Sequence, residues 1–261
     1  MRRPVRIAAA LAAGIMAASV PTLVGADTAS AATSGASYAA LGDSYSSGYG
    51  ASSTYLNTCA QSTAAYPYLY DQATAPASFD FAACAGATTS DVVSTQLGGL
   101  NSGTTLVSMT IGGNDVGLVD VAAACSAGTD SQCSAAVATA AEAAVTQLPG
   151  ALDTLFTDVR NDAPNARVVV LGYPELFDTS ATNCVLLDQN KRTAIADGAD
   201  VLNAAIAAET SQHSGFVYQD VVHRFAGHEL CDAAPWIDAT TLHPTADGQA
   251  DAYLPALEAG A

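Results

Sequence analysis

Residues 167–172 read Arg-Val-Val-Val-Leu-Gly, and the four apolar side chains from Val168 to Leu171 follow one another without a polar interruption. A continuous apolar run of this length is typical of a strand that is buried on both faces. Its three β-branched valines favour a strand over a helix. Because strands covered on both faces belong to parallel sheets in α/β proteins, this run predicts that fold class.

Similar short runs recur along the chain and alternate with longer helical stretches. This alternation predicts an α/β fold, a three-layer α/β/α sandwich around a five-stranded parallel sheet. Pro149-Gly150 should bend or break the longest predicted helix. The predicted strands are 37–41, 78–81, 106–111, 167–171 and 215–219, and the predicted helices are 66–73, 90–97, 131–162, 188–211 and 245–258.

The N-terminus has the pattern of a secretory signal peptide. Three arginines lie within residues 2–6, an alanine-rich apolar stretch runs from 7 to 24, and Ala29-Ser30-Ala31 offers a cleavage site. An uncleaved anchor is the alternative, but Pro21 interrupts the apolar stretch. We therefore expect residues 1–31 to be removed on export, and residues 32–261 to form one secreted domain.

The charge balance excludes several classes of partner. Residues 32–261 hold 5 basic and 24 acidic residues, a net charge of −19 with histidine neutral. A chain this acidic should repel nucleic acid and anionic membranes. No further apolar run is long enough to cross a bilayer, so we expect no membrane insertion, and we expect a monomer.

Six cysteines lie beyond the predicted signal peptide, and an even number in an exported protein indicates three disulfides. The sequence alone permits fifteen pairings. A zinc site is the alternative, but no pair has the C-x-x-C or C-x-x-H spacing. The cysteines are Cys59, Cys84, Cys125, Cys133, Cys184 and Cys231.

Glycine-rich polar segments follow four of the predicted strands, at 42–48, 85–89, 112–117 and 172–177. Loops at the carboxyl ends of parallel strands build the ligand site of an open sheet. Ser44, flanked by glycines, could present its hydroxyl there, although a polar turn or a helix N-cap is an equal alternative. The segment is not the G-x-S-x-G elbow of α/β-hydrolases.

Three further residues are candidates for the same site. The N–H of Gly86 could approach a developing oxyanion, and the Asn114 side chain could donate to it. The alternatives are a simple strand-to-helix turn at Gly86 and an Asx-turn at Asn114. His243 is fixed between a loop and the last helix by Pro244, which suits a positioned base, whereas the other three histidines fit exposed or structural positions.

Together these segments resemble the SGNH (GDSL-type) hydrolase family, whose four motif blocks occur in the right order between residues 41 and 249. The residues that give that family its name map onto Ser44, Gly86, Asn114 and His243. Residues 227–231 and 235–237, with the six cysteines, are similar to its secreted actinobacterial lipase and esterase branch. The motif blocks read Leu41-Gly42-Asp43-Ser44, Cys84-Ala85-Gly86, Gly112-Gly113-Asn114-Asp115 and Leu242-His243-Pro244.

The resemblance implies a flavodoxin-like sandwich that transfers acyl groups from esters. Ser44 would be the nucleophile and His243 the base, and the N–H groups of Ser44 and Gly86 with the Asn114 carboxamide would form the oxyanion hole. Sequential disulfide pairing (59–84, 125–133 and 184–231) rests partly on this resemblance.

One position departs from the family pattern. Many members carry an aspartate three residues before the histidine, where this chain has Thr240. The resemblance to the actinobacterial branch therefore implies a Ser-His dyad whose imidazole is oriented by the Thr240 carbonyl, with Asp238 as the rival third member. Asp43 is expected to brace its turn through backbone hydrogen bonds.

The substrate is less sharply predicted than the reaction. The branch resemblance favours lipid or fatty-acyl esters. A carbohydrate acetylesterase is the alternative within the enzyme class, and a catalytically idle glycan-binding or surface-binding module is the alternative outside it.

Neither a P-loop nor a G-x-G-x-x-G motif follows the first strand, so we expect no cofactor and no metal. Nine apolar residues near the active edge could line an acyl groove, although each taken singly fits packing better: Tyr45, Tyr49, Leu118, Val119, Tyr173, Leu176, Phe177, Leu186 and Leu187.

Overall fold

Five short strands form one parallel sheet in the computed structural model, which describes residues 35–261. The predicted signal peptide (1–31) lies outside these residues. The strands follow one another across the sheet as β2 (Ser78–Phe81), β1 (Ser37–Ala40), β3 (Leu106–Met109), β4 (Arg167–Leu171) and β5 (Phe216–Gln219).

The inner strands β3 and β4 are almost completely buried. Every residue of β3 is buried, and in β4 only Arg167 at the start is exposed. Val107 pairs with Val168, and Met109 pairs with Val170. This burial explains why the apolar run of β4 shows no alternation: neither face of the strand meets water.

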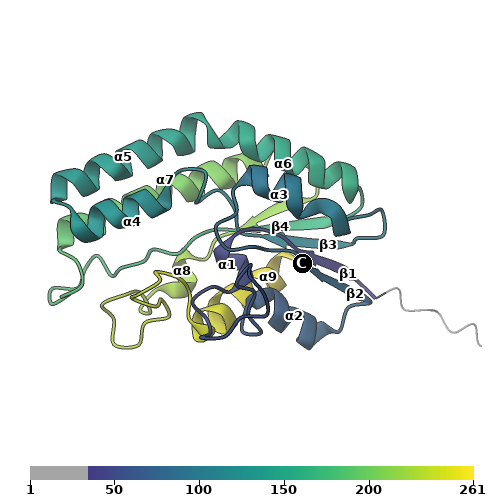
Figure 1. Ribbon diagram of the computed structural model, residues 1–261, viewed down its shortest axis with the longest axis horizontal. Coiled ribbons are helices and arrows are strands. Elements are labelled where there is room, and N and C mark those ends of the chain that lie inside the picture. Colours follow the sequence, from purple (N-terminus) through teal and green to yellow (C-terminus); the bar gives the residue numbers. More distant parts are fainter. Residues whose placement is uncertain (1–34) are drawn as a thin grey trace, which may run out of the picture. The chain divides into compact units, whose positions relative to one another are not determined.

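Helices cover both faces of this sheet (Figure 1). On one face lie α3 (Thr89–Thr95), α4 (Leu118–Ala127), α5 (Asp130–Thr146), α6 (Leu148–Asp162) and α7 (Gln189–Thr210). The other face carries α2 (Tyr66–Thr74), α8 (Val222–Phe225) and α9 (Leu254–Gly260), while α1 (Ser44–Ser47) follows β1 directly. A 3-10 turn (Leu97–Gly99) and a π-helical turn (Gly248–Tyr253) complete the elements.

The predicted α/β/α sandwich is confirmed, and all five predicted strands are present within two residues of their predicted ends. The long predicted helix 131–162 is two helices that meet at Gln147, with Pro149 in the first turn of α6. The short helices α1 and α8, and also α4, were not predicted from the sequence. Helix α4 starts after Gly117 without a capping side chain, so it lacks the usual start signal.

Three disulfides join Cys59 to Cys84, Cys125 to Cys133 and Cys184 to Cys231, in the sequential pairing that was expected. The second links α4 to α5, and the third links the loop before α7 to the loop after α8. Among residues 35–261, no helix combines the length and apolarity that a bilayer crossing requires.

Candidate active site

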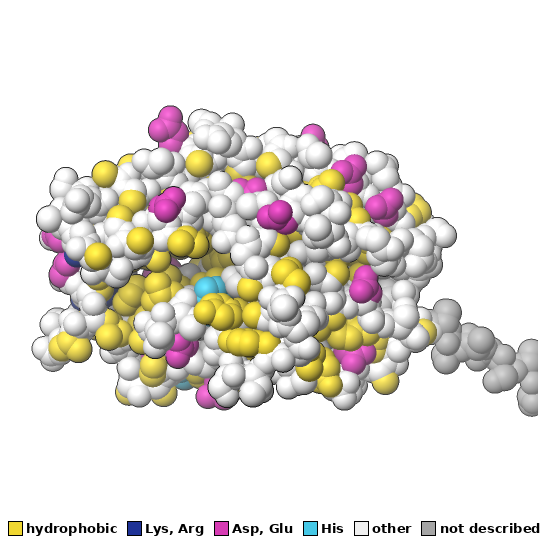
Figure 2. Space-filling view, in the orientation of Figure 1, with side chains coloured by type: hydrophobic (Ala, Val, Ile, Leu, Met, Phe, Trp, Pro, Cys, Tyr) yellow, Lys and Arg dark blue, Asp and Glu magenta, His cyan; other side chains and the backbone are white. Residues whose placement is uncertain are grey.

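A pocket of about 720 Å³ opens at the carboxyl ends of the strands. Ser44, Gly86, Asn114 and His243 all line it, although they lie far apart in the sequence. Figure 2 shows a hollow on this face, with hydrophobic side chains around it and one histidine side chain visible in it. The four predicted site residues are therefore brought together in one place.

Ser44 begins α1, after a turn of three residues (41–43) that follows β1. The turn requires glycine at position 42, because its φ is 113° and a Cβ would lie 2.3 Å from the Thr110 carbonyl oxygen. The Gln96 side chain bonds to both the N–H and the C=O of this glycine (2.7 and 2.9 Å). This tight approach between β1 and β3 fixes the position from which Ser44 projects.

The buried carboxylate of Asp43 braces the same turn, but through two side-chain hydroxyls as well as the expected backbone bond. Its oxygens accept from the backbone N–H of Tyr45 (3.0 Å), the hydroxyl of Thr110 (2.7 Å) and the hydroxyl of Tyr173. Burial raises the pKa of Asp43 to about 6, while these hydrogen bonds oppose the rise. Asp43 caps α1 and makes no hydrogen bond to His243, so it holds the backbone at Ser44.

His243 faces Ser44 across the pocket, with its Nε2 atom 2.7 Å from Ser44 Oγ. Its Nδ1 atom lies 2.6 Å from the backbone carbonyl of Thr241. Because a carbonyl oxygen only accepts, Nδ1 must carry the proton, which leaves the Nε2 lone pair directed at the serine hydroxyl. Such a pair can take a proton from Ser44 when the serine attacks an electrophile.

The prediction that Thr240 supplies the orienting carbonyl is wrong by one residue. The turn is closed around Asp238, whose Oδ1 accepts from the N–H groups of Thr240 (3.1 Å) and Thr241 (2.8 Å). This clamp leaves the carbonyl of Thr241, two residues before the histidine, at the imidazole. The three-residue spacing describes an aspartate side chain in other family members, so it does not locate a backbone carbonyl that takes the same place.

Asp238 acts on His243 through this turn and not through a direct hydrogen bond, since Nδ1 is bonded to the Thr241 carbonyl. Burial lowers the pKa of His243, and the Thr241 hydrogen bond and the Asp238 charge partly offset the lowering. The imidazole is therefore neutral at neutral pH, the form that a general base needs.

Aromatic rings enclose the imidazole. The rings of Tyr45 and Tyr49 lie 4.8 and 4.9 Å from that of His243, centroid to centroid. The Tyr45 hydroxyl donates to the carbonyl of Leu242 (2.8 Å), a residue with a φ of 59°. Positive φ is costly for leucine, so contacts of this kind must hold the backbone in place just before the histidine.

Gly86 and Asn114 present donors on the wall next to Ser44. Gly86 has a φ of 85°, and a Cβ there would meet no atom within 4 Å. Within residues 35–261, neither the N–H of Ser44 nor that of Gly86 donates a hydrogen bond to another residue. Asn114 Nδ2 donates to the Ala87 carbonyl (2.9 Å), which sets the carboxamide's orientation. Two free amides and a carboxamide can stabilise negative charge on an oxygen beside Ser44.

All nine apolar residues named as candidates for a groove line the pocket. The assignment of each one to packing alone is therefore incomplete. Tyr45, Tyr173 and Phe177 are buried in the core and form part of the pocket wall as well. The wall is predominantly apolar, with the polar groups gathered at Ser44 and His243, which suits an ester with a hydrophobic acyl part.

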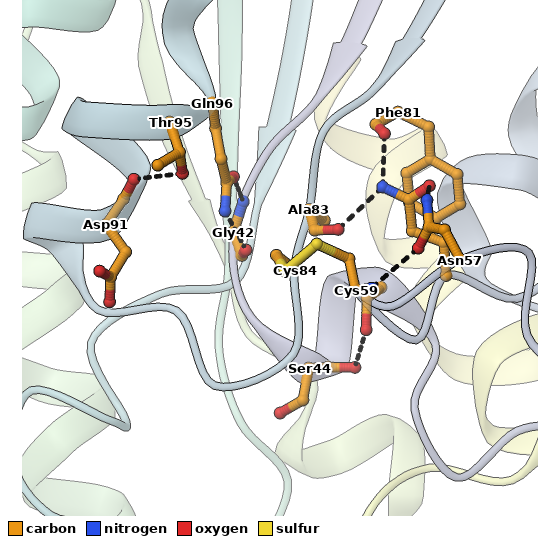
Figure 3. Close-up of a disulfide and its surroundings, with 12 residues drawn as sticks. Gly42, Ser44, Asn57, Cys59, Phe81, Ala83, Cys84, Asp91, Thr95 and Gln96 are labelled. Atoms are coloured by element: carbon orange, nitrogen blue, oxygen red, sulfur yellow. Dashed lines mark hydrogen bonds between the residues drawn. A yellow bond between two sulfur atoms is a disulfide. The ribbon is translucent and has the colours of Figure 1, made fainter.

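The disulfides stabilise the walls of the pocket. Cys59–Cys84 lies beside the Ser44 segment (Figure 3), and the N–H of Ala85 donates to the Cys59 carbonyl (3.0 Å) next to Gly86. Cys125 on α4 lines the pocket directly, and Cys184 precedes the pocket residues Leu186 and Leu187.

Some supporting residues were missed by sequence reasoning. Gln249 accepts from the N–H of Tyr66 and donates to the carbonyl of Tyr45 (both 2.9 Å), while Tyr173 accepts from the N–H of Gly113 (3.0 Å). Each of these bonds joins segments distant in the sequence, so no local pattern signals them.

Among the described residues, the side chains that could hold a metal ion lie outside the pocket. Asp153, Glu209 and His213 place ligand atoms within 4.8 Å of one another on α6, α7 and the following loop. The two carboxylates lie 3.4 and 3.1 Å from the same histidine Nε2, so mutual pairing accounts for this cluster. None of the three lines the pocket.

Comparisons with known proteins agree with the geometry. Lipase 1 of Streptomyces coelicolor is 45% identical over 100% of both chains. A crystal structure of phospholipase A1 from Streptomyces albidoflavus NA297 matches with a TM-score of 0.84 and 45% identity, covering 87% of this chain and 100% of that one. An extracellular lipase of Streptomyces rimosus matches with a TM-score of 0.83 and 43% identity, covering 87% and 100%.

The sequence profile of the GDSL-like lipase/acylhydrolase family matches residues 40–250, a span that contains all four motif blocks. The chain therefore belongs to the GDSL-like lipase/acylhydrolase family and is a carboxylic ester hydrolase.

Proposed function

We propose that this protein is a secreted lipase or esterase that cleaves fatty-acyl esters through a Ser44–His243 dyad and an acyl-enzyme. The observation that carries the proposal is the 2.7 Å contact between His243 Nε2 and Ser44 Oγ, with Nδ1 held by a carbonyl. The relatives named lipase and phospholipase A1, and the largely apolar pocket, support a fatty-acyl substrate. The three disulfides and the extracellular lipase of Streptomyces rimosus support secretion.

In the first half-reaction His243 Nε2 takes the hydroxyl proton as Ser44 Oγ attacks the ester carbonyl carbon. The carbonyl oxygen becomes an oxyanion, which the N–H groups of Ser44 and Gly86 and the carboxamide of Asn114 stabilise. The C–O bond to the alcohol breaks, and the imidazolium returns the proton to the leaving oxygen. The acyl group remains on Ser44.

In the second half-reaction water gives a proton to His243 and attacks the acyl carbon. The same donors stabilise the second oxyanion, and Ser44 leaves as its hydroxyl. The Thr241 carbonyl stabilises the imidazolium formed in both steps, because it accepts the Nδ1 proton.

The test is hydrolysis of p-nitrophenyl esters from acetyl to palmitoyl by the protein lacking residues 1–31, with Ser44→Ala in parallel. We expect turnover that increases beyond acetyl and falls by about 10⁴-fold or more in the variant. A preference for acetyl with no activity on longer chains would favour a carbohydrate acetylesterase. Full activity in Ser44→Ala would refute the proposed nucleophile.

A further inference from the structure

Large apolar side chains that remain exposed are concentrated at one place on the described surface. They are Tyr55, Leu56, Val119, Val145, Val185 and Leu186. Four of these six line the pocket, adjoin a lining residue or contact one. Leu56 follows Tyr55 in the chain, and Val145 on α5 does not line the pocket. We call the set of Tyr55, Leu56, Val119, Val185 and Leu186 the rim.

Contacts with the pocket tie the rim together. Val119 and Leu186 line the pocket themselves, and Val185, which is 96% exposed, precedes Leu186. The ring of Tyr55 stacks on that of Tyr49 at 5.8 Å, and Tyr49 in turn contacts His243. The rim therefore comes from three separate segments that meet around the entrance, where Figure 2 shows hydrophobic side chains around the hollow.

The exposure of these side chains is not explained by folding. An exposed apolar side chain gains nothing from burial, and a group of them rimmed by polar residues marks an interaction surface. Disulfide Cys184–Cys231 and the hydrogen bonds of Arg192 to the carbonyls of Asp178 and Ala181 hold the loop that carries Val185 and Leu186. The loop is therefore fixed with its apolar residues facing outward.

The charges around the rim restrict the partner. Asp120 follows Val119, and Asp188 follows Leu187, so carboxylates flank the rim on two of its segments. The cations nearest in sequence, Lys191 and Arg192, are buried and bonded to backbone carbonyls. An anionic surface would be repelled here, whereas a neutral or zwitterionic one would not.

We propose that the rim docks the enzyme on the surface of aggregated neutral or zwitterionic lipid, with the pocket mouth facing the lipid. This inference rests on the proposed function, since it supplies the route by which a lipid ester reaches Ser44. Insertion of the rim would bury apolar area and place the entrance at the acyl chains.

The test compares Leu56→Ser/Val185→Ser with Val145→Ser, a matched control because Val145 is similarly exposed (59%) away from the rim. Neither Leu56 nor Val185 lines the active-site pocket. Binding is measured by flotation with phosphatidylcholine vesicles in a Ser44→Ala background, so that lipid is not consumed. Activity is measured separately, on the same variants with Ser44 intact. The substrates are dissolved p-nitrophenyl butyrate and phosphatidylcholine vesicles.

We expect the double variant to bind vesicles about tenfold more weakly and to lose vesicle hydrolysis in proportion, while the Val145→Ser control and all activities on the dissolved ester stay unchanged. Vesicles containing phosphatidylglycerol should bind less than pure phosphatidylcholine. Equal binding by both variants, or tighter binding to anionic vesicles, would overturn the inference. If the parent protein does not hydrolyse the dissolved ester at all, the proposed function is refuted instead.

Discussion

The two halves of the Ser44–His243 pair are held in different ways. The segment 41–48 around Ser44 is buried almost throughout and is bonded to side chains from distant parts of the chain, among them Gln96, Thr110 and Tyr173. The segment 238–243 around His243 is half-buried, with only Ala239 and Thr240 exposed, and is closed mainly by bonds within its own six residues.

From this contrast we expect the stability of the fold and the proton chemistry of His243 to respond to different substitutions. Changes in the network around Ser44 should cost stability, because they leave buried polar groups without partners. Changes in the turn before His243 should leave stability nearly intact and alter the titration of the imidazole. The following substitutions test that division.

The largest effect is expected for His243→Ala. Without the imidazole, Ser44 has no base, and kcat should fall by about 10⁴-fold or more. Its melting temperature should stay close to that of the parent, since the histidine is held by a local turn. A fall in activity accompanied by unfolding would contradict the division between the two segments.

A smaller loss is expected for Asn114→Ala. If the carboxamide stabilises the oxyanion, its removal should reduce kcat by about 10²–10³-fold with little change in KM. Steady-state kinetics on one soluble ester measures this split. A change confined to KM would instead assign Asn114 to substrate binding.

Tyr173→Phe tests the hydrogen-bond network around Ser44. The variant removes a hydrogen-bond donor to Asp43 and an acceptor for the N–H of Gly113, both in a buried site. The free energy of unfolding should therefore fall by about 1–3 kcal/mol. Tyr218→Phe is the matched control, because the Tyr218 hydroxyl is buried without a hydrogen-bond partner among the described residues. Equal destabilisation of both variants in urea would show that the Asp43 contacts are unimportant.

The smallest effect is expected for Asp238→Asn. Its charge raises the pKa of His243, so removing it should lower that pKa further below the ordinary value. The acidic limb of kcat/KM reports deprotonation of His243 and should therefore move to lower pH, while kcat changes by less than about tenfold. A loss of several orders of magnitude in an intact fold would make Asp238 a third catalytic member.

The same contrast explains what the sequence could predict. The strands were recognisable because burial leaves a local pattern, as in Val168–Leu171, and the glycine-flanked Ser44 follows one of them. Spacing could not distinguish the Thr241 carbonyl from that of Thr240, because every residue carries the same group. The hydrogen bonds from Gln96, Gln249 and Tyr173 join residues far apart in the sequence, so no local sequence pattern predicts them.

The central claim is that His243 activates Ser44 for attack, and covalent labelling tests it most directly. The protein is treated with a fluorophosphonate, and the adduct is located by mass spectrometry in the parent, Ser44→Ala and His243→Ala. The account predicts one adduct on Ser44, none in Ser44→Ala, and labelling slowed by orders of magnitude in His243→Ala. Labelling of a different residue, or an unchanged rate without His243, would contradict it.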